Sequence, residues 1–252
     1  MDDMFVQKRG QEIAEKVEQV YRKHTEPRYI GLVVHGSAVK GGFIEGCSDI
    51  DFQLYVEDDM LDGRGNLPLE LCFRIHRDLA QIDPYPFRYI QTEVFSRQHS
   101  KHGDLAPGTY RLISGRMLFP EASGQQLYER SVQALAKLRP EPFDSGKLLD
   151  HGEGRLERAV RGLCTVVWPT LYQVLTVMRK DGATVWALPK TTALTLLPEE
   201  DELGDSIRSF YRAVREYYPS ESSVEAGLNV IRQGTEFLAK ARSRAGLHLA
   251  DN

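Results

Sequence analysis

Two aspartates, Asp49 and Asp51, are separated by one apolar residue and open a run in which polar and apolar residues alternate up to Val56. Alternation with a period of two is typical of a strand with one buried face, so both carboxylates are expected side by side on the other face. Neighbouring carboxylates repel each other, and one tends to take up a proton unless a cation lies between them. Their hard oxygen atoms suit Mg²⁺, which usually keeps some waters and also binds substrate phosphates.

The other part of the candidate site is a possible phosphate-binding segment that comes before the aspartates in the sequence. The apolar run from Leu32 to Val34 predicts a buried strand, which ends at Gly36-Ser37. Glycine lets the backbone approach a ligand closely, and backbone N–H groups and a hydroxyl at a helix start bind phosphate oxygens. Together with the carboxylates this predicts metal-assisted phosphoryl or nucleotidyl transfer. The alternative for Asp-x-Asp alone is a solvated strand edge, and its combination with Gly-Ser is the more specific signal.

Eleven residues, 38 to 48, separate Ser37 from Asp49, and Ile50-Asp51-Phe52 follow. This pattern resembles the nucleotidyltransferase superfamily that includes DNA polymerase beta, and it is most similar to the bacterial aminoglycoside nucleotidyltransferases of antibiotic resistance. The resemblance covers residues 29–56 strictly and the rest of the chain more weakly. It implies an adenylyltransferase that transfers AMP, or another nucleoside monophosphate, from ATP or another nucleoside triphosphate to a hydroxyl of a small molecule such as an aminoglycoside, releasing pyrophosphate.

The resemblance also implies roles for individual residues. Asp49 and Asp51 would hold one or two Mg²⁺ ions and take part in catalysis. Gly36, Ser37 and Ser48 would contact the nucleotide, with the first two at the β- and γ-phosphates.

A third carboxylate is implied on a later strand. Residues 87–95 predict that strand, and Glu93 is the only acidic residue within it. By the resemblance, Glu93 would be a metal ligand, the base that deprotonates the acceptor hydroxyl, or both. A carboxylate beside other carboxylates has a raised pKa, which suits a base near neutral pH. The alternative is an ordinary glutamate on the surface of a strand.

Lys190 is the last predicted site residue. The segment from Trp186 to Ala193 is similar to a lysine-bearing helix start in aminoglycoside adenylyltransferases, where the lysine reaches the nucleotide triphosphate. A lysine at a helix start is repelled by the helix dipole unless an anion lies there, which favours a phosphate contact. The alternative is a surface lysine without a role.

Composition bounds the function further. The 252 residues carry a formal net charge of −4, which argues against a dedicated nucleic-acid binder and is compatible with a cationic small substrate. The three cysteines, an odd number without metal-ligand spacing, fit a reducing cytoplasm. No apolar run is long enough to span a membrane, so no membrane association is expected.

Two domains are expected. Residues 1–138 predict an α/β (α+β) nucleotidyltransferase domain, in which helices cover a small mixed sheet, and residues 139–252 predict an all-α helical bundle. The prolines of residues 139–145 mark the boundary. Expected strands are 29–34, 49–56 and 87–95, an apolar segment with a turn at 114–115 follows, and expected helices are 7–24, 67–82, 125–138, 148–180 with a kink or break at Pro169, 188–197, 207–218 and 224–241.

Two alternatives to a small-molecule acceptor stay open. One is nucleotidyl transfer to a protein or to RNA, although the absence of a basic excess makes nucleic acid an unfavoured partner. The other is a non-catalytic nucleotide-binding regulatory module that keeps the fold. A homodimer is compatible with the resemblance, and the sequence does not specify it.

Overall fold

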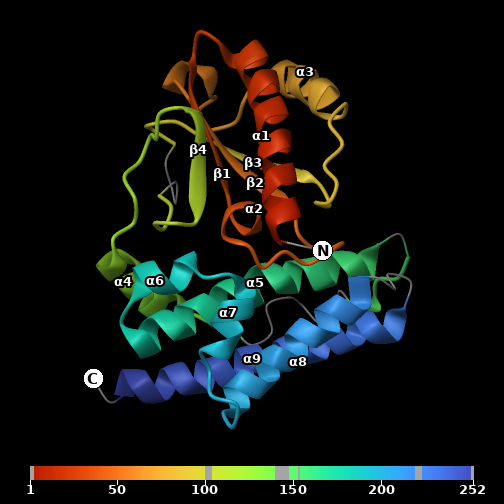
Figure 1. The fold of residues 1–252 in the computed structure, drawn as a ribbon, viewed down its shortest axis with the longest axis vertical. Coiled ribbons are helices and arrows are strands. Elements are labelled where there is room, and N and C mark those ends of the chain that lie inside the picture. The colour runs from red at the N-terminus through yellow and green to blue at the C-terminus, as the bar shows by residue number, and fades with distance from the viewer. Residues whose placement is uncertain (1–2, 100–103, 140–147, 153, 219–222, 251–252) are drawn as a thin grey trace. The chain divides into compact units, whose positions relative to one another are not determined.

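The computed structural model describes residues 3–99, 104–139, 148–152, 154–218 and 223–250. The chain divides into two compact units, Met1–Ala122 and Ser123–Asn252, and Figure 1 labels their helices and strands. The division comes one helix earlier than the predicted boundary at 138/139. The predicted linker, 139–145, lies outside the described residues except for Arg139.

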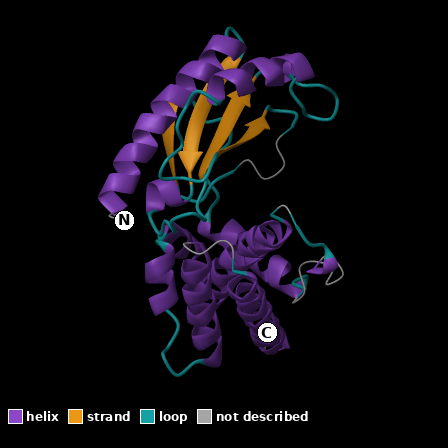
Figure 2. Ribbon diagram, turned by 90° about the vertical axis from the view of Figure 1, so that its right-hand side faces the viewer, coloured by secondary structure: helices purple, strands orange, loops and turns teal. Residues whose placement is uncertain are grey.

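The first unit is built on a four-stranded mixed sheet with the strand order β3-β2-β1-β4 (Figure 2). β1 is antiparallel to both β2 and β4, whereas β2 and β3 are parallel. The mixed α/β character expected from the sequence is confirmed. The strands are β1 Tyr29–His35, β2 Ile50–Val56, β3 Ile90–Phe95 and β4 Tyr110–Gly115.

Strand β4 differs from its prediction. A turn was expected at 114–115, but Ser114 and Gly115 continue the strand and pair with Leu32 and Gly31 of β1. Glycine on both strands permits this pairing, because a Cβ on Gly115 would lie 2.1 Å from the carbonyl oxygen of Ile30. A glycine that the sequence suggested as a turn residue is therefore a site of close backbone approach.

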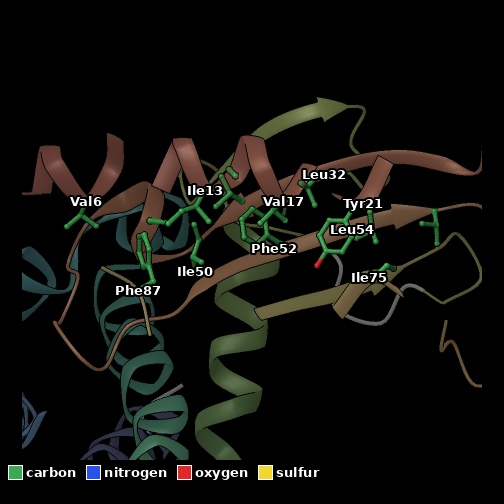
Figure 3. Packing of buried hydrophobic residues seen from close by; sticks show 14 of the residues in the cluster. Val6, Ile13, Val17, Tyr21, Leu32, Ile50, Phe52, Leu54, Ile75 and Phe87 are labelled. Atoms are coloured by element: carbon green, nitrogen blue, oxygen red, sulfur yellow. The ribbon is translucent and has the colours of Figure 1, made fainter. Parts of the chain in front are cut away.

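One face of the sheet is covered by two amphipathic helices, α1 (Asp3–Thr25) and α3 (Leu69–Leu79). Figure 3 shows side chains of α1 packed with strand residues in one apolar cluster. The α1 residues at helical spacing, such as Ile13 and Val17, are completely buried there. The remaining elements of this unit are the four-residue helix α2 (Ser37–Lys40) and the 3₁₀ helix η1 (Asp58–Met60).

The opposite face carries a smaller apolar cluster around Val33, Tyr55 and Phe95. Leu105 and the segment Met117 to Phe119 pack against it. The hydroxyl of Tyr55 donates a hydrogen bond to Gln53 Oε1 at 2.7 Å within this face. Asp51 lies on the same face as Gln53 and Tyr55, at the end of the strand where the apolar cluster stops.

All regular elements in the described part of the second unit are helices. Helix α5 runs through Pro169 as one element, so the expected break is absent and the expected helix is largely confirmed. Helix α4 belongs here because Leu127 faces α6, where a Cβ on Gly182 would lie only 2.6 Å from its Cβ. The helices are α4 Gly124–Ala136, α5 Arg155–Arg179, α6 Gly182–Ala187, α7 Lys190–Thr195, α8 Glu202–Tyr217 and α9 Val224–Ala250.

The close approach of β1 and β4 predicts that a side chain at position 31 destabilises the fold. A Cβ on Gly31 would lie 2.4 Å from the carbonyl oxygen of Arg116, so Gly31→Ala must displace backbone atoms. We expect a loss of about 1–3 kcal/mol in the free energy of unfolding, measured with denaturant. Gly63→Ala is the matched control, because no described atom lies within 4 Å of its Cβ position. Equal stability of the two variants would contradict the proposed contact.

Candidate functional site

The two halves of the predicted motif meet at one end of the sheet. In the antiparallel pairing of β1 with β2, the last residue of β1, His35, is opposite Asp51. The chain leaves β1 through Gly36 and enters β2 at Asp49-Ile50, so the Gly-Ser and Asp-x-Asp segments lie side by side. Sequence spacing alone suggested this proximity, and the strand register produces it.

Gly36 makes the closest approach to the aspartates. A Cβ built on Gly36 would lie 2.8 Å from Asp51 Oδ2, and the backbone has φ 74° and ψ −142°. Both facts require glycine here, because other residues rarely adopt this conformation and would place a side chain against the carboxylate. The Gly36 amide donates to the carbonyl oxygen of Thr109 at 3.0 Å, which fixes the turn.

Ser37 begins the short helix α2 directly after this turn. The amides of Val39 and Lys40 both donate to the carbonyl oxygen of Gly36, at 3.1 and 3.0 Å. Ser37 is buried at 7% exposure. The predicted phosphate-binding residues thus lie at a helix start, with Gly36 as the N-cap, whose own amide is bonded to Thr109, and Ser37 as the first residue of the four-residue helix.

Ser48 closes the loop between α2 and β2. Its hydroxyl accepts a hydrogen bond from the Ile44 amide at 2.9 Å, and its own amide donates to the Ile44 carbonyl oxygen at 2.9 Å. Ser48 is buried at 6% exposure. Its geometry gives it a local role, which is to hold the residue before Asp49, and its predicted contact with a nucleotide stays a prediction.

The charge of the aspartate pair is not offset by the neighbouring imidazole. Burial lowers the pKa of His35 to about 4, although the negative charge of Asp49 acts in the opposite direction. His35 is therefore neutral near pH 7 and does not form an ion pair with the aspartates. Asp49 and Asp51 are themselves only partly buried.

Glu93 lies farther from the pair than the sequence suggested. In the parallel register of β2 and β3, Glu93 is opposite Gln53, and Gln91 is opposite Asp51. Within the described ranges there is no group of three or more His, Cys, Asp or Glu side chains that could hold a metal ion. The structure thus brings Asp49 and Asp51 together with the Gly-Ser turn but does not assemble a three-carboxylate set. A catalytic role of Glu93 stays a prediction.

Lys190 belongs to the second unit. It is the first residue of α7, after Pro189 at the N-cap, and its Nζ lies 5.7 Å from the centre of the Trp168 ring. This contact is a cation–π interaction within the same unit. Its contact with a triphosphate stays a prediction.

The second unit also contains a cavity of about 340 Å³. It is lined by residues at the starts of α5 and α9, among them His151, Arg155 and Leu228. None of the predicted site residues lines this cavity.

Neither a protein-family model nor a curated protein matches the chain. Among solved structures, the chain is similar to the crystal structure of spectinomycin adenyltransferase AAD(9) from Enterococcus faecialis with ATP and spectinomycin. The TM-score is 0.52 at 17% sequence identity, and the match covers 90% of this chain and 98% of that chain. The fold is therefore nucleotidyltransferase-like. In the part of the chain that is described, no helix combines the length and apolarity that a membrane crossing needs.

The Gly36 geometry leads to a second prediction. Gly36→Ala places a methyl group against Asp51 and forces an unfavourable backbone conformation, at a cost of roughly 1–3 kcal/mol in stability. We expect the folded variant also to lose divalent-cation binding at the aspartate pair, measured by Mn²⁺ titration with electron paramagnetic resonance. Gly63→Ala should change neither property. Unaltered Mn²⁺ affinity in folded Gly36→Ala would show that the glycine does not shape the cation site.

Proposed function

We propose that this protein is a Mg²⁺-dependent nucleotidyltransferase that transfers AMP, or another nucleoside monophosphate, from a nucleoside triphosphate to a hydroxyl of a small molecule. The observation that carries the proposal is the close approach of Gly36 to Asp51, whose Oδ2 would lie 2.8 Å from a Cβ at position 36, in a nucleotidyltransferase-like fold. A helix start suited to phosphate and an oxygen donor pair suited to Mg²⁺ lie next to each other there.

The residues fit a magnesium ion on two grounds. The donor set consists of the carboxylate oxygens of Asp49 and Asp51, which Mg²⁺ prefers, and neutral His35 adds no competing positive charge. Gly36 leaves open the space beside Asp51 that any other side chain would fill. When bound, Mg²⁺ would neutralise phosphate charge and that of the departing pyrophosphate.

The chain's own groups have defined tasks in this proposal. Asp49 and Asp51 would hold the cation at the charged end of the nucleotide, and Gly36 and Ser37 would lie at the β- and γ-phosphates. The acceptor oxygen forms a bond to the α-phosphorus, the bond from the α-phosphorus to the bridging oxygen breaks, and pyrophosphate leaves. The hydroxyl proton passes to a base or to water.

Substitution of Asp51 tests this function directly. Asp51→Asn keeps the shape of the side chain and removes its charge, so we expect pyrophosphate release from Mg-ATP to fall by roughly a factor of 10³ or more while the fold persists. Asp205→Asn is the matched control, because its exposed ion pair with Arg208 on α8 contributes little stability. Full activity of Asp51→Asn would exclude the assignment.

The acceptor is the substrate whose hydroxyl receives the nucleoside monophosphate. The similar adenyltransferase was solved with ATP and spectinomycin, and we propose ATP as donor and an aminoglycoside or a comparable hydroxylated small molecule as acceptor. The assay is pyrophosphate release with a panel that includes spectinomycin, aminoglycosides and a sample without acceptor. Release that depends on one compound supports the proposal. Mg-ATP binding without turnover for the panel, for RNA or for proteins would favour a non-catalytic module.

Substitution of Lys190 tests whether this residue contributes to ATP binding. If its ammonium group contacts a phosphate, Lys190→Met should raise the KM for ATP by about tenfold, the scale of one charge-assisted hydrogen bond. Loss of its contact with Trp168 should cost only about 0.5–1 kcal/mol of stability. Lys240→Met, which removes an exposed pair with Glu236, is the control. An unchanged KM for ATP would assign Lys190 a structural role.

A further inference from the structure

The strand β3 contributes a residue to the candidate site that the sequence motif did not identify. Asp51 is opposite Gln91 in the register of the parallel strands, and partners in a parallel pair project to the same face about 4.8 Å apart. Gln91 is therefore the β3 residue whose side chain starts next to the Asp51 carboxylate. Glu93 starts two residues farther along, about 6–7 Å toward the other end of the strand.

Backbone hydrogen bonds also join the residues before Gln91 to the residues on both sides of Asp49. The Ile50 amide donates to the carbonyl oxygen of Tyr89 at 3.1 Å, and the Arg88 amide donates to the carbonyl oxygen of Ser48 at 2.9 Å. These two hydrogen bonds hold Arg88 and Tyr89, the residues directly before β3, on either side of Asp49, so the register at the aspartate pair is set by the backbone. The register thus places Gln91 of β3 opposite Asp51 and the preceding Tyr89 beside Asp49, and neither of these two side chains carries a charge.

Tyr89 and Gln91 interact with each other. The Tyr89 hydroxyl donates a hydrogen bond to Gln91 Oε1 at 3.2 Å, which leaves the two amide N–H groups as the donors that Gln91 can offer. Both residues are exposed, with Tyr89 at 38%. An amide donor beside Asp51 can orient that carboxylate without adding negative charge.

Glu93 has different surroundings. Its neighbour on β2 is Gln53, which is buried at 2% exposure and accepts the hydrogen bond of the Tyr55 hydroxyl. The next pair along the strands is Tyr55 and Phe95, which belong to the apolar cluster of this face. Glu93 is therefore at the border of the apolar cluster and not beside the aspartates.

We propose that the cation site of this protein has two carboxylates and not three, and that Gln91, held by Tyr89, is the positioning residue of β3 that orients Asp51. This inference rests on the proposed function, because it assigns a task to Gln91 within that site. It predicts that a change of charge at position 91 alters the affinity for the cation more than a change at position 93 does. Cation affinity can be measured without any turnover.

The experiment is Mn²⁺ titration by electron paramagnetic resonance, with and without ATP and without acceptor. Gln91→Glu adds a third carboxylate beside the pair, so we expect tighter Mn²⁺ binding, with an affinity that falls as the pH is lowered because protons compete with the cation for the carboxylates. Gln91→Ala should weaken binding by about tenfold or more, as losses of groups that orient metal ligands do. Glu93→Gln should have a much smaller effect, and exposed Gln81→Ala is the matched control.

Three results are distinguishable. The expected order of affinities, with position 91 dominant over position 93, supports the inference. If Glu93→Gln weakens Mn²⁺ binding as strongly as Asp51→Asn, and Gln91→Glu has no effect, the inference is wrong while the proposed function stands. If the unmodified protein binds no Mn²⁺, or if Asp51→Asn binds it normally, the proposed function fails, and the inference fails with it. Circular dichroism of each variant checks that the fold is retained.

Discussion

The close approach of Gly36 to the Asp51 carboxylate is the constraint on which the candidate site depends. A Cβ on any other residue at position 36 would lie only 2.8 Å from Asp51 Oδ2. The antiparallel pairing of β1 and β2 sets this distance, and the apolar cluster under α1 and α3 stabilises the pairing. Burial of that cluster therefore does more than stabilise the fold, because it holds the helix start at Gly36 and Ser37 beside the two aspartates that we propose as cation ligands.

Local patterns were sufficient to predict three of the four strands, β1 to β3, and most helices. The alternation that follows Asp49 specifies which side chains share a face, and the helical spacing of Ile13 and Val17 specifies the buried side of α1. The mixed sheet and the helical character of the C-terminal half are confirmed on this basis. Strand alternation and helical spacing both repeat within a single strand or helix, so the sequence of that one element is enough to reveal them.

Strand register was not predictable in the same way. Alternation places Gln91 and Glu93 on one face, but it does not say which of them is opposite Asp51, because that depends on two backbones pairing. The boundary expected from composition, between residues 138 and 139, differs from the division between residues 122 and 123 for a similar reason. The prolines after α4 suggested a division there, but the apolar side of α4, which includes Leu127, packs in the second unit. An amphipathic pattern indicates that a face is buried and not which partner buries it.

The fold and the site support different parts of the functional proposal. At 17% identity the similarity to an adenyltransferase concerns the backbone, and one backbone can support many reactions. The local geometry is more restrictive, because the register places an uncharged side chain, that of Gln91, opposite Asp51. A site with two carboxylates repels a phosphate less than one with three and offers a cation fewer ligands. Affinity for the cation then depends more strongly on how the two aspartates are oriented, which gives an uncharged hydrogen-bond donor such as Gln91 a physical role.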